Sequence, residues 1–116
     1  MRNKKTGKLF AEKCVPCEAG EKPLGKPEIE NLKKQIAKAW EIINEIKLKR
    51  KFKFKNFKES INFINLVAKL AENEGHHPDL YIFYNYVIIE LWTHAVHGLS
   101  KNDFVLAAKI DKLITG

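Results

Sequence analysis

A lysine at every second position from Lys47 to Lys55 is the feature that most restricts how this chain folds. The positions between and just before these lysines are large and mostly apolar: Ile46, Leu48, Arg50, Phe52 and Phe54. Successive side chains of a β-strand point to opposite faces, so this period of two predicts a strand with one buried face and one lysine face. Such a strand is stable only when another layer of the fold covers its apolar face.

Helical spacing of apolar residues predicts that covering layer. Residues at spacings of three and four predict an amphipathic helix after Pro27, and they are Ile29, Leu32, Ile36, Ala39, Trp40 and Ile43. Asn56 is a suitable N-cap for a second helix, which we expect to end near residues 73–75. A last helix is predicted over residues 104–114, after a capping box formed by Ser100 and Asp103.

Residues 80–92 are rich in Tyr, Ile, Phe and Val and are interrupted at Asn85-Tyr86, which predicts two short strands joined by a tight turn. The predicted order is therefore helix, strand, helix, strand, strand, helix. We expect an α+β fold, an antiparallel β-sheet with α-helices packed on one face. Residues 1–27 are punctuated by glycine and proline, so we expect an extended N-terminal arm followed by a single domain over residues 28–116.

The net charge of +7 on 116 residues suggests an acidic partner, but the distribution of the charge argues against nucleic acid. Between Lys47 and Lys58 there are six lysines and one arginine with no acidic residue. A nucleic-acid stacking platform needs aromatic rings on the lysine face, whereas the period of two puts Phe52 and Phe54 on the opposite face. We therefore expect no nucleic-acid partner and assign the lysines to keeping an exposed strand hydrated.

Three observations bear on location. No stretch of 18 apolar residues occurs, which excludes a membrane-spanning helix. The basic start of the chain is not followed by an apolar segment, so no secretory signal is predicted. The two cysteines, Cys14 and Cys17, are too few for a disulfide scaffold and fit a reducing compartment. We expect a cytoplasmic protein with no membrane contact.

All four histidines lie within 22 residues, at His76, His77, His94 and His97. The predicted elements place His76 and His77 in the loop after the second helix and His94 at the end of the last strand. Since neighbouring strands of a meander bring their ends together, these three are expected to converge on one pocket at the rim of the sheet. Histidine titrates near neutrality, so this set suits acid–base catalysis. From spacing alone, a solvent-exposed turn at His76-His77 remains the alternative.

Metal binding and redox chemistry are weaker interpretations. The pairs Cys14/Cys17 and His94/His97 each offer two ligands, but about 76 residues separate them, and a compact zinc module needs its pairs close together. We therefore predict no metal. The CxxC precedes every predicted strand, whereas a thioredoxin-like motif opens a helix after one.

Two carboxylates flank the histidines. Glu72 lies one helical turn before the His76-His77 loop, and Asp103 lies in the first turn of the last helix. Each is able to accept a proton from an imidazole and so to fix its tautomer. Each also has a simpler interpretation, a solvated helix end for Glu72 and completion of the Ser100 cap for Asp103. For Asp103 the capping role is favoured.

A longer motif runs through these residues. It consists of Glu74-Gly75-His76-His77-Pro78, five residues, Tyr84, nine residues, His94, eight residues and Asp103. This motif resembles the signature of the pterin-4a-carbinolamine dehydratases. Further similar segments, which extend the resemblance from Cys14 to Leu113, are residues 14–18, 50–54 with Phe57, 67–72, 93–94, 98–100 and 103–104.

The resemblance implies an enzyme that removes water from 4a-hydroxytetrahydropterin and yields the quinonoid dihydropterin, in tetrahydrobiopterin recycling. It implies that His76 and His94 are the acid and the base, in either order, and that His77 orients the pterin and assists proton transfer. It implies no metal or redox cofactor. The implied partners are the pterin substrate and further copies of the chain, in a homodimer or homotetramer.

The resemblance also bears on the pocket around the histidines. The expected substrate-binding residues are Pro78, Thr93, Glu72 and Asp103, of which Pro78 and Thr93 are expected to line the pocket. Many members carry an aromatic residue, often Trp, where this chain has Leu80, and a polar or acidic residue where it has Gly75. Loss of a flat ring would weaken stacking on the pterin. Two other functions stay open: a non-enzymatic dimerisation cofactor of a transcription factor, and a pterin protein of a molybdopterin-related pathway.

Overall fold

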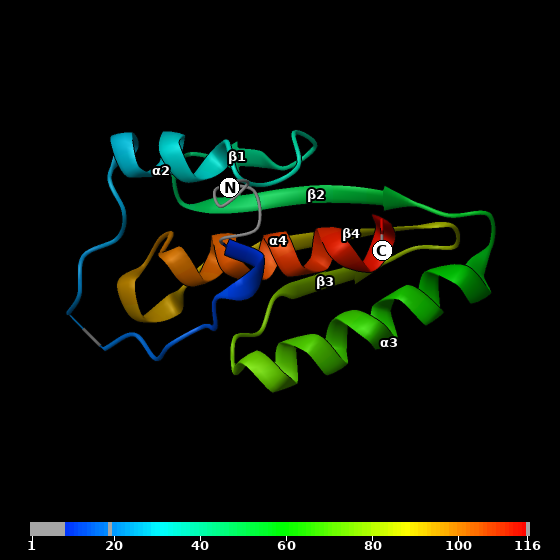
Figure 1. Ribbon diagram of the computed structural model, residues 1–116. Helices are drawn as coiled ribbons and strands as arrows, with labels where there is room; N and C mark the ends of the chain where they lie inside the picture. Colours follow the sequence, from blue (N-terminus) through cyan, green and yellow to red (C-terminus); the bar gives the residue numbers. More distant parts are fainter. Residues whose placement is uncertain (1–8, 19, 116) are drawn as a thin grey trace, which may run out of the picture.

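The predicted α+β architecture is confirmed. The structure is a computed structural model that describes residues 9–18 and 20–115 (Figure 1). Its elements are, in order, α2 (Lys26–Lys33), β1 (Glu41–Ile43), β2 (Lys47–Lys53), α3 (Phe57–Glu74), β3 (Asp79–Ile82), β4 (Tyr86–Leu91), the 3₁₀ turn η1 (His94–Val96) and α4 (Lys101–Thr115). The backbone of residues 9–11 is helical as well.

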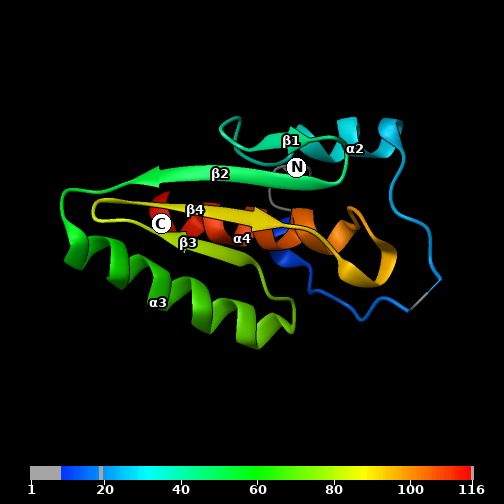
Figure 2. The same cartoon turned by 180° about the vertical axis from the view of Figure 1, so that it is seen from behind.

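The four strands pair antiparallel in the order β1-β2-β4-β3. α4 lies in front of the sheet in Figure 1 and behind it in Figure 2, so that helix and sheet form two layers. The register pairs Leu48 with Leu91 and Phe52 with Val87, and all four side chains are buried. These cross-strand pairs give the sheet one covered face.

β2 has the two faces that its sequence predicts, with Leu48 and Phe52 buried and Lys51 and Lys53 exposed. The lysine face nevertheless carries an aromatic ring. Nζ of Lys51 lies 4.3 Å from the ring centroid of Tyr86, which belongs to β4. A pattern within one strand does not reveal a ring that the neighbouring strand supplies.

The predicted helix over residues 29–43 is wrong in its second half. α2 is only eight residues long, and residues 41–43 form the unpredicted strand β1. The cause lies in α4, where the carboxylate of Asp111 accepts hydrogen bonds from the backbone N–H of Ala37 at 2.9 Å and from Nε1 of Trp40 at 2.8 Å. A helix would direct the N–H of Ala37 to the carbonyl four residues earlier, so the tertiary contact replaces the helical one.

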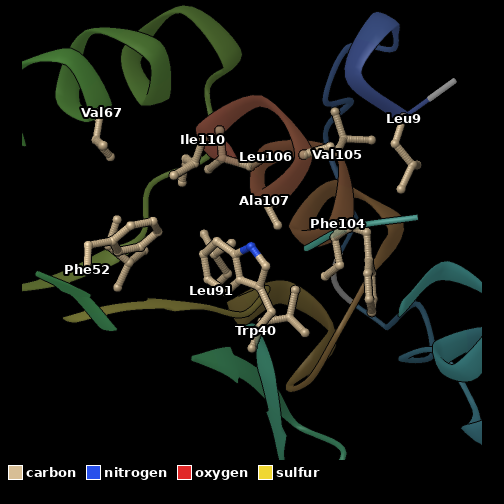
Figure 3. Packing of buried hydrophobic residues seen from close by; sticks show 14 of the residues in the cluster. Leu9, Trp40, Phe52, Val67, Leu91, Phe104, Val105, Leu106, Ala107 and Ile110 are labelled. Atoms are coloured by element: carbon tan, nitrogen blue, oxygen red, sulfur yellow. The ribbon is translucent and has the colours of Figure 1, made fainter. Parts of the chain in front are cut away.

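The helix boundaries after β2 agree with the sequence. The side chain of Asn56 accepts a hydrogen bond from the backbone N–H of Glu59 at 2.9 Å and caps α3. Gly75 ends α3 in the left-handed conformation, with φ of 67°. α4 supplies most of one side of the core (Figure 3). None of the helices in the described part of the chain is long and apolar enough to cross a membrane.

The described part of the arm packs on the domain. Leu9 is buried and belongs to the core cluster, on its α4 side in Figure 3. The N–H of Leu24 donates to the carbonyl of Leu99 at 2.8 Å, and a Cβ at Gly98 would lie only 2.9 Å from Cβ of Pro23. The division into an arm over residues 1–27 and a domain over 28–116 stays a prediction, since residues 1–8, 19 and 116 lie outside the described residues.

Candidate functional site

A pocket of about 480 Å³ lies at one end of the sheet. The loop from α3 to β3 and the segment after β4 come together there (Figure 2). The residues that line it are Gly75, His76, His77, Pro78, Asp79, Trp92, Thr93 and His94. The structure thus brings together all three histidines that the sequence singled out, together with Pro78 and Thr93.

Helix termination places His76. Gly75 turns the chain out of α3, and the N–H of His76 still donates to the carbonyl of Ala71 at 3.3 Å, as in a Schellman end. The ring then lies over the start of α4, where Nε2 of His76 is 2.6 Å from Oδ1 of Asp103. The side chain of His76 is 12% exposed and that of Asp103 is fully buried.

Asp103 is the centre of a buried hydrogen-bond network. Its Oδ2 accepts from the hydroxyl of Thr93 at 2.8 Å and from the backbone N–H of Ser100 at 2.9 Å. Because the Thr93 proton is used in this way, the hydroxyl of Ser100 donates to Oγ1 of Thr93 at 2.7 Å. The capping role favoured from the sequence is therefore half of the arrangement: one carboxylate oxygen closes the cap and the other holds His76.

The second histidine of the pair has a partner of a different kind. Nε2 of His77 lies 2.8 Å from Oε1 of Glu72, one turn back on α3. The side chains are 63% and 79% exposed, so water screens this contact. Glu72 does not line the pocket.

His94 begins η1, three residues beyond the end of β4, so its predicted place at the end of the last strand is corrected. Its exposed ring stacks on Trp92, with centroids 3.9 Å apart and planes 29° apart. The fourth histidine, His97, which is not part of the motif, is exposed and does not line the pocket.

Two pocket residues were missed by the sequence analysis. Trp92 follows β4 directly, and its Nε1 donates to Oδ2 of Asp79 at 3.2 Å across the pocket wall. The signal available in the sequence was an aromatic residue, Trp92, directly before Thr93-His94. Among the described residues, no three His, Cys, Asp or Glu side chains are grouped so as to hold a metal ion.

Comparisons with known proteins identify the family. Residues 22–113 match the family model described as pterin 4 alpha carbinolamine dehydratase. A protein of Alkaliphilus metalliredigens is 48% identical over 104 residues, covering 90% of this chain and 94% of that protein. A protein of Rickettsia bellii is 49% identical over 109 residues, covering 93% and 96%. Both carry the provisional name pterin-4-alpha-carbinolamine dehydratase.

Two solved structures share the fold. The transcriptional coactivator/pterin dehydratase from Brucella melitensis is 29% identical, with a TM-score of 0.73 over 81% of this chain and 99% of that one. A pterin dehydratase-like protein described as a RuBisCO assembly factor in the alpha-carboxysome is 25% identical, with a TM-score of 0.56 over 65% and 88%. On the family model and these relatives, the chain belongs to the pterin 4 alpha carbinolamine dehydratase family.

Proposed function

We propose that this protein is a 4a-hydroxytetrahydropterin dehydratase. In this reaction a base takes the proton from N5 of the pterin, the C4a–O bond breaks, and an acid protonates the departing hydroxyl to give water. The products are the quinonoid dihydropterin and water, and the two protons balance between base and acid. The observation that carries the proposal is the contact of buried Asp103 with His76, which lines a pocket together with His77 and His94.

The contact with Asp103 supports a role for His76 as proton acceptor. An ionised carboxylate only accepts hydrogen bonds, so Nε2 of His76 carries the proton that lies between them. In the neutral ring the other nitrogen, Nδ1, is then the acceptor. A fixed tautomer spares the reaction the cost of orienting the ring.

His94 suits the complementary role. Its ring is exposed, and stacking on Trp92 limits its orientation. Trp92 also supplies a flat ring to the pocket, which bears on the departure at Leu80: the aromatic surface that many members place after the proline comes here from the end of β4. His77 is proposed to orient the pterin, and no metal or redox cofactor is proposed.

The test is a dehydratase assay on purified protein. His76→Gln and His94→Gln are each expected to lower kcat by about 100-fold or more, the usual contribution of one general acid or base. His97→Gln is the matched control, an exposed histidine of the same segment outside the pocket, and should change kcat by less than about twofold. A wild type no faster than buffer, beside an active reference dehydratase, would overturn the proposal.

Failure of that assay would favour a binding role instead, because the two structural neighbours are described as a transcriptional coactivator/pterin dehydratase and as a RuBisCO assembly factor. A molybdopterin-related pathway is the remaining alternative, and binding of unhydroxylated pterins without turnover would favour it.

We also propose a homodimer or homotetramer in the cytoplasm. Support comes from β3, an edge strand on which Tyr81 and Ile82 are both exposed, and light scattering would measure the mass.

A further inference from the structure

The arm segment from Cys14 to Cys17 contacts the residues that stand next to the His76–Asp103 pair. The arm runs beside the start of α4 (Figures 1 and 2). It meets Asn102, which directly precedes Asp103, and Glu74, which stands two positions before His76. The segment therefore bridges the end of α3 and the beginning of α4, the two elements that carry the pair.

Asn102 makes a two-way contact with the arm. Its Oδ1 accepts from the backbone N–H of Val15 at 2.9 Å, and its Nδ2 donates to the carbonyl of Val15 at 2.5 Å. An asparagine amide matches a peptide group in this way, so one side chain replaces a rung of β-ladder between the arm and α4. Asn102 is buried, which makes loss of either bond costly.

Glu74 ties the same segment to both helices. Its Oε1 accepts from the backbone N–H of Cys14 at 2.9 Å, and its Oε2 lies 3.3 Å from Nζ of Lys109 on α4. Only 6% of its side chain is exposed. Burial alone would raise the pKa of Glu74, but the Cys14 hydrogen bond and the Lys109 ammonium outweigh it and hold the pKa below its usual value.

The two thiols complete the contact around Asn102. Sγ of Cys14 lies 3.6 Å from the carbonyl of Asn102, and Nδ2 of Asn102 lies 3.6 Å from Sγ of Cys17. Burial, together with the charges of Glu74 and Asp103, raises the pKa of Cys14 to about 12. The Cys14 thiol therefore stays protonated at working pH and remains a donor.

We propose that Asn102 and Glu74 are positioning residues for the proposed reaction, and that the Cys14–Cys17 segment is the clamp through which they fix His76 against Asp103. The inference rests on the proposed function, because it assigns a role in that reaction. The contacts of Asn102 and Glu74 themselves are observed whether or not the protein is an enzyme. Neither side chain lines the pocket, so the proposed role is to position other residues and not to contact the substrate. They act by holding the end of α3 and the start of α4 at a fixed separation, which sets the 2.6 Å contact between Nε2 of His76 and Oδ1 of Asp103.

The kinetic test uses Asn102→Ala and Glu74→Ala. Each is expected to lower kcat by about 10-fold, the scale of a small misplacement of catalytic groups, with KM changed by less than about twofold. Glu74→Gln keeps an acceptor for the Cys14 N–H and should recover most of the lost kcat. Lys101→Ala is the matched control. It removes the surface pair between Nζ of Lys101 and Glu12 of the arm, which is 2.9 Å long, and leaves the contacts of Asn102 and Glu74 in place.

A second readout separates this inference from the proposed function. The proton on Nε2 of His76 gives an NMR signal, assigned by its loss in His76→Gln, that reports the hydrogen bond to Asp103 directly. Asn102→Ala and Glu74→Ala should shift this signal while Glu74→Gln and Lys101→Ala leave it in place. An inactive wild type with these shifts would overturn the function and keep the clamp. Folded variants with unchanged signal and unchanged kcat would overturn the clamp. If an alanine variant lacks a cooperative melt, Asn102→Leu, which is close to Asn in size and makes neither bond to Val15, takes its place and should shift the same signal.

Discussion

His76 and His77 are neighbours in sequence and each has a carboxylate within hydrogen-bond distance, yet their surroundings are opposite. The His76–Asp103 contact is 2.6 Å long, with side chains 12% and 0% exposed. The His77–Glu72 contact is 2.8 Å long, with side chains 63% and 79% exposed. Judged by distance alone, the two pairs would be equivalent.

Burial and supporting hydrogen bonds distinguish the pairs. Asp103 is held by Thr93 and Ser100 as well as by His76, so the position of its carboxylate does not depend on the imidazole alone. Glu72 stands on an exposed turn of α3, where water competes for both partners and salt screens the charges. A short histidine–carboxylate contact fixes a ring only when the carboxylate is itself fixed.

Replacing Asp103 should have the largest effect. Asp103→Asn replaces one carboxylate oxygen with an amide nitrogen, which does not accept hydrogen bonds. At least one of His76, Thr93 and Ser100 therefore loses its acceptor. We expect kcat to fall by about 100-fold or more and the free energy of unfolding to fall by about 1–3 kcal/mol. The dehydratase assay and urea unfolding measure these. Retention of more than half of wild-type kcat would show that His76 needs no fixed partner.

Much of this region was predictable from local patterns. Asn56, Gly75 and Ser100 mark helix ends by their own chemistry, so the positions of the His76-His77 loop and of Asp103 followed from spacing. The contacts of Asp111 with Ala37 and Trp40 join residues more than 70 positions apart and override the helical period there. No local rule anticipates such a partner.

The same limit applies to the site. That Glu72 and Asp103 are able to accept from the two histidines was an inference from the sequence, but the depth of each pair depends on what covers it. Thr93 was expected only as a pocket residue, and its hydroxyl bond to Asp103 emerged from the tertiary fold. Asn102 and Val15, 87 positions apart, carry no sequence signal for their contact.

Raising the pH tests the buried surroundings of Asp103 through the nearby thiol of Cys14, and the expected effect on stability is of intermediate size. Burial and the charges of Glu74 and Asp103 raise the pKa of Cys14 from 9.0 to about 12. Below pH 9 the thiol is protonated in both states and contributes nothing. Between pH 9 and 12 the unfolded chain releases this proton and the folded one keeps it, so stability falls as pH rises.

The expected loss from this thiol between pH 8 and pH 10 is at most about 1.4 kcal/mol. Urea unfolding of wild type and Cys14→Ser at the two pH values measures it. The serine hydroxyl does not titrate in this range, so the variant should lose less stability than the wild type, and both share the titration of the lysines and tyrosines. Equal losses would mean that neither burial nor the nearby carboxylates raise the pKa of Cys14 in the folded protein.

Replacing Glu72 should have the smallest effect, which is the sharpest test of the comparison. Glu72→Gln removes the charge from the exposed pair and keeps an oxygen and a nitrogen for His77, so we expect the free energy of unfolding to change by less than about 0.5 kcal/mol. We expect kcat to change by less than about twofold, because water already competes for His77 in the wild type. The same assay and urea unfolding measure both, with Asp103→Asn run in parallel. A loss in kcat close to that of Asp103→Asn would mean that substrate excludes water from the His77–Glu72 pair, and that the exposure of the two pairs does not rank the two histidines.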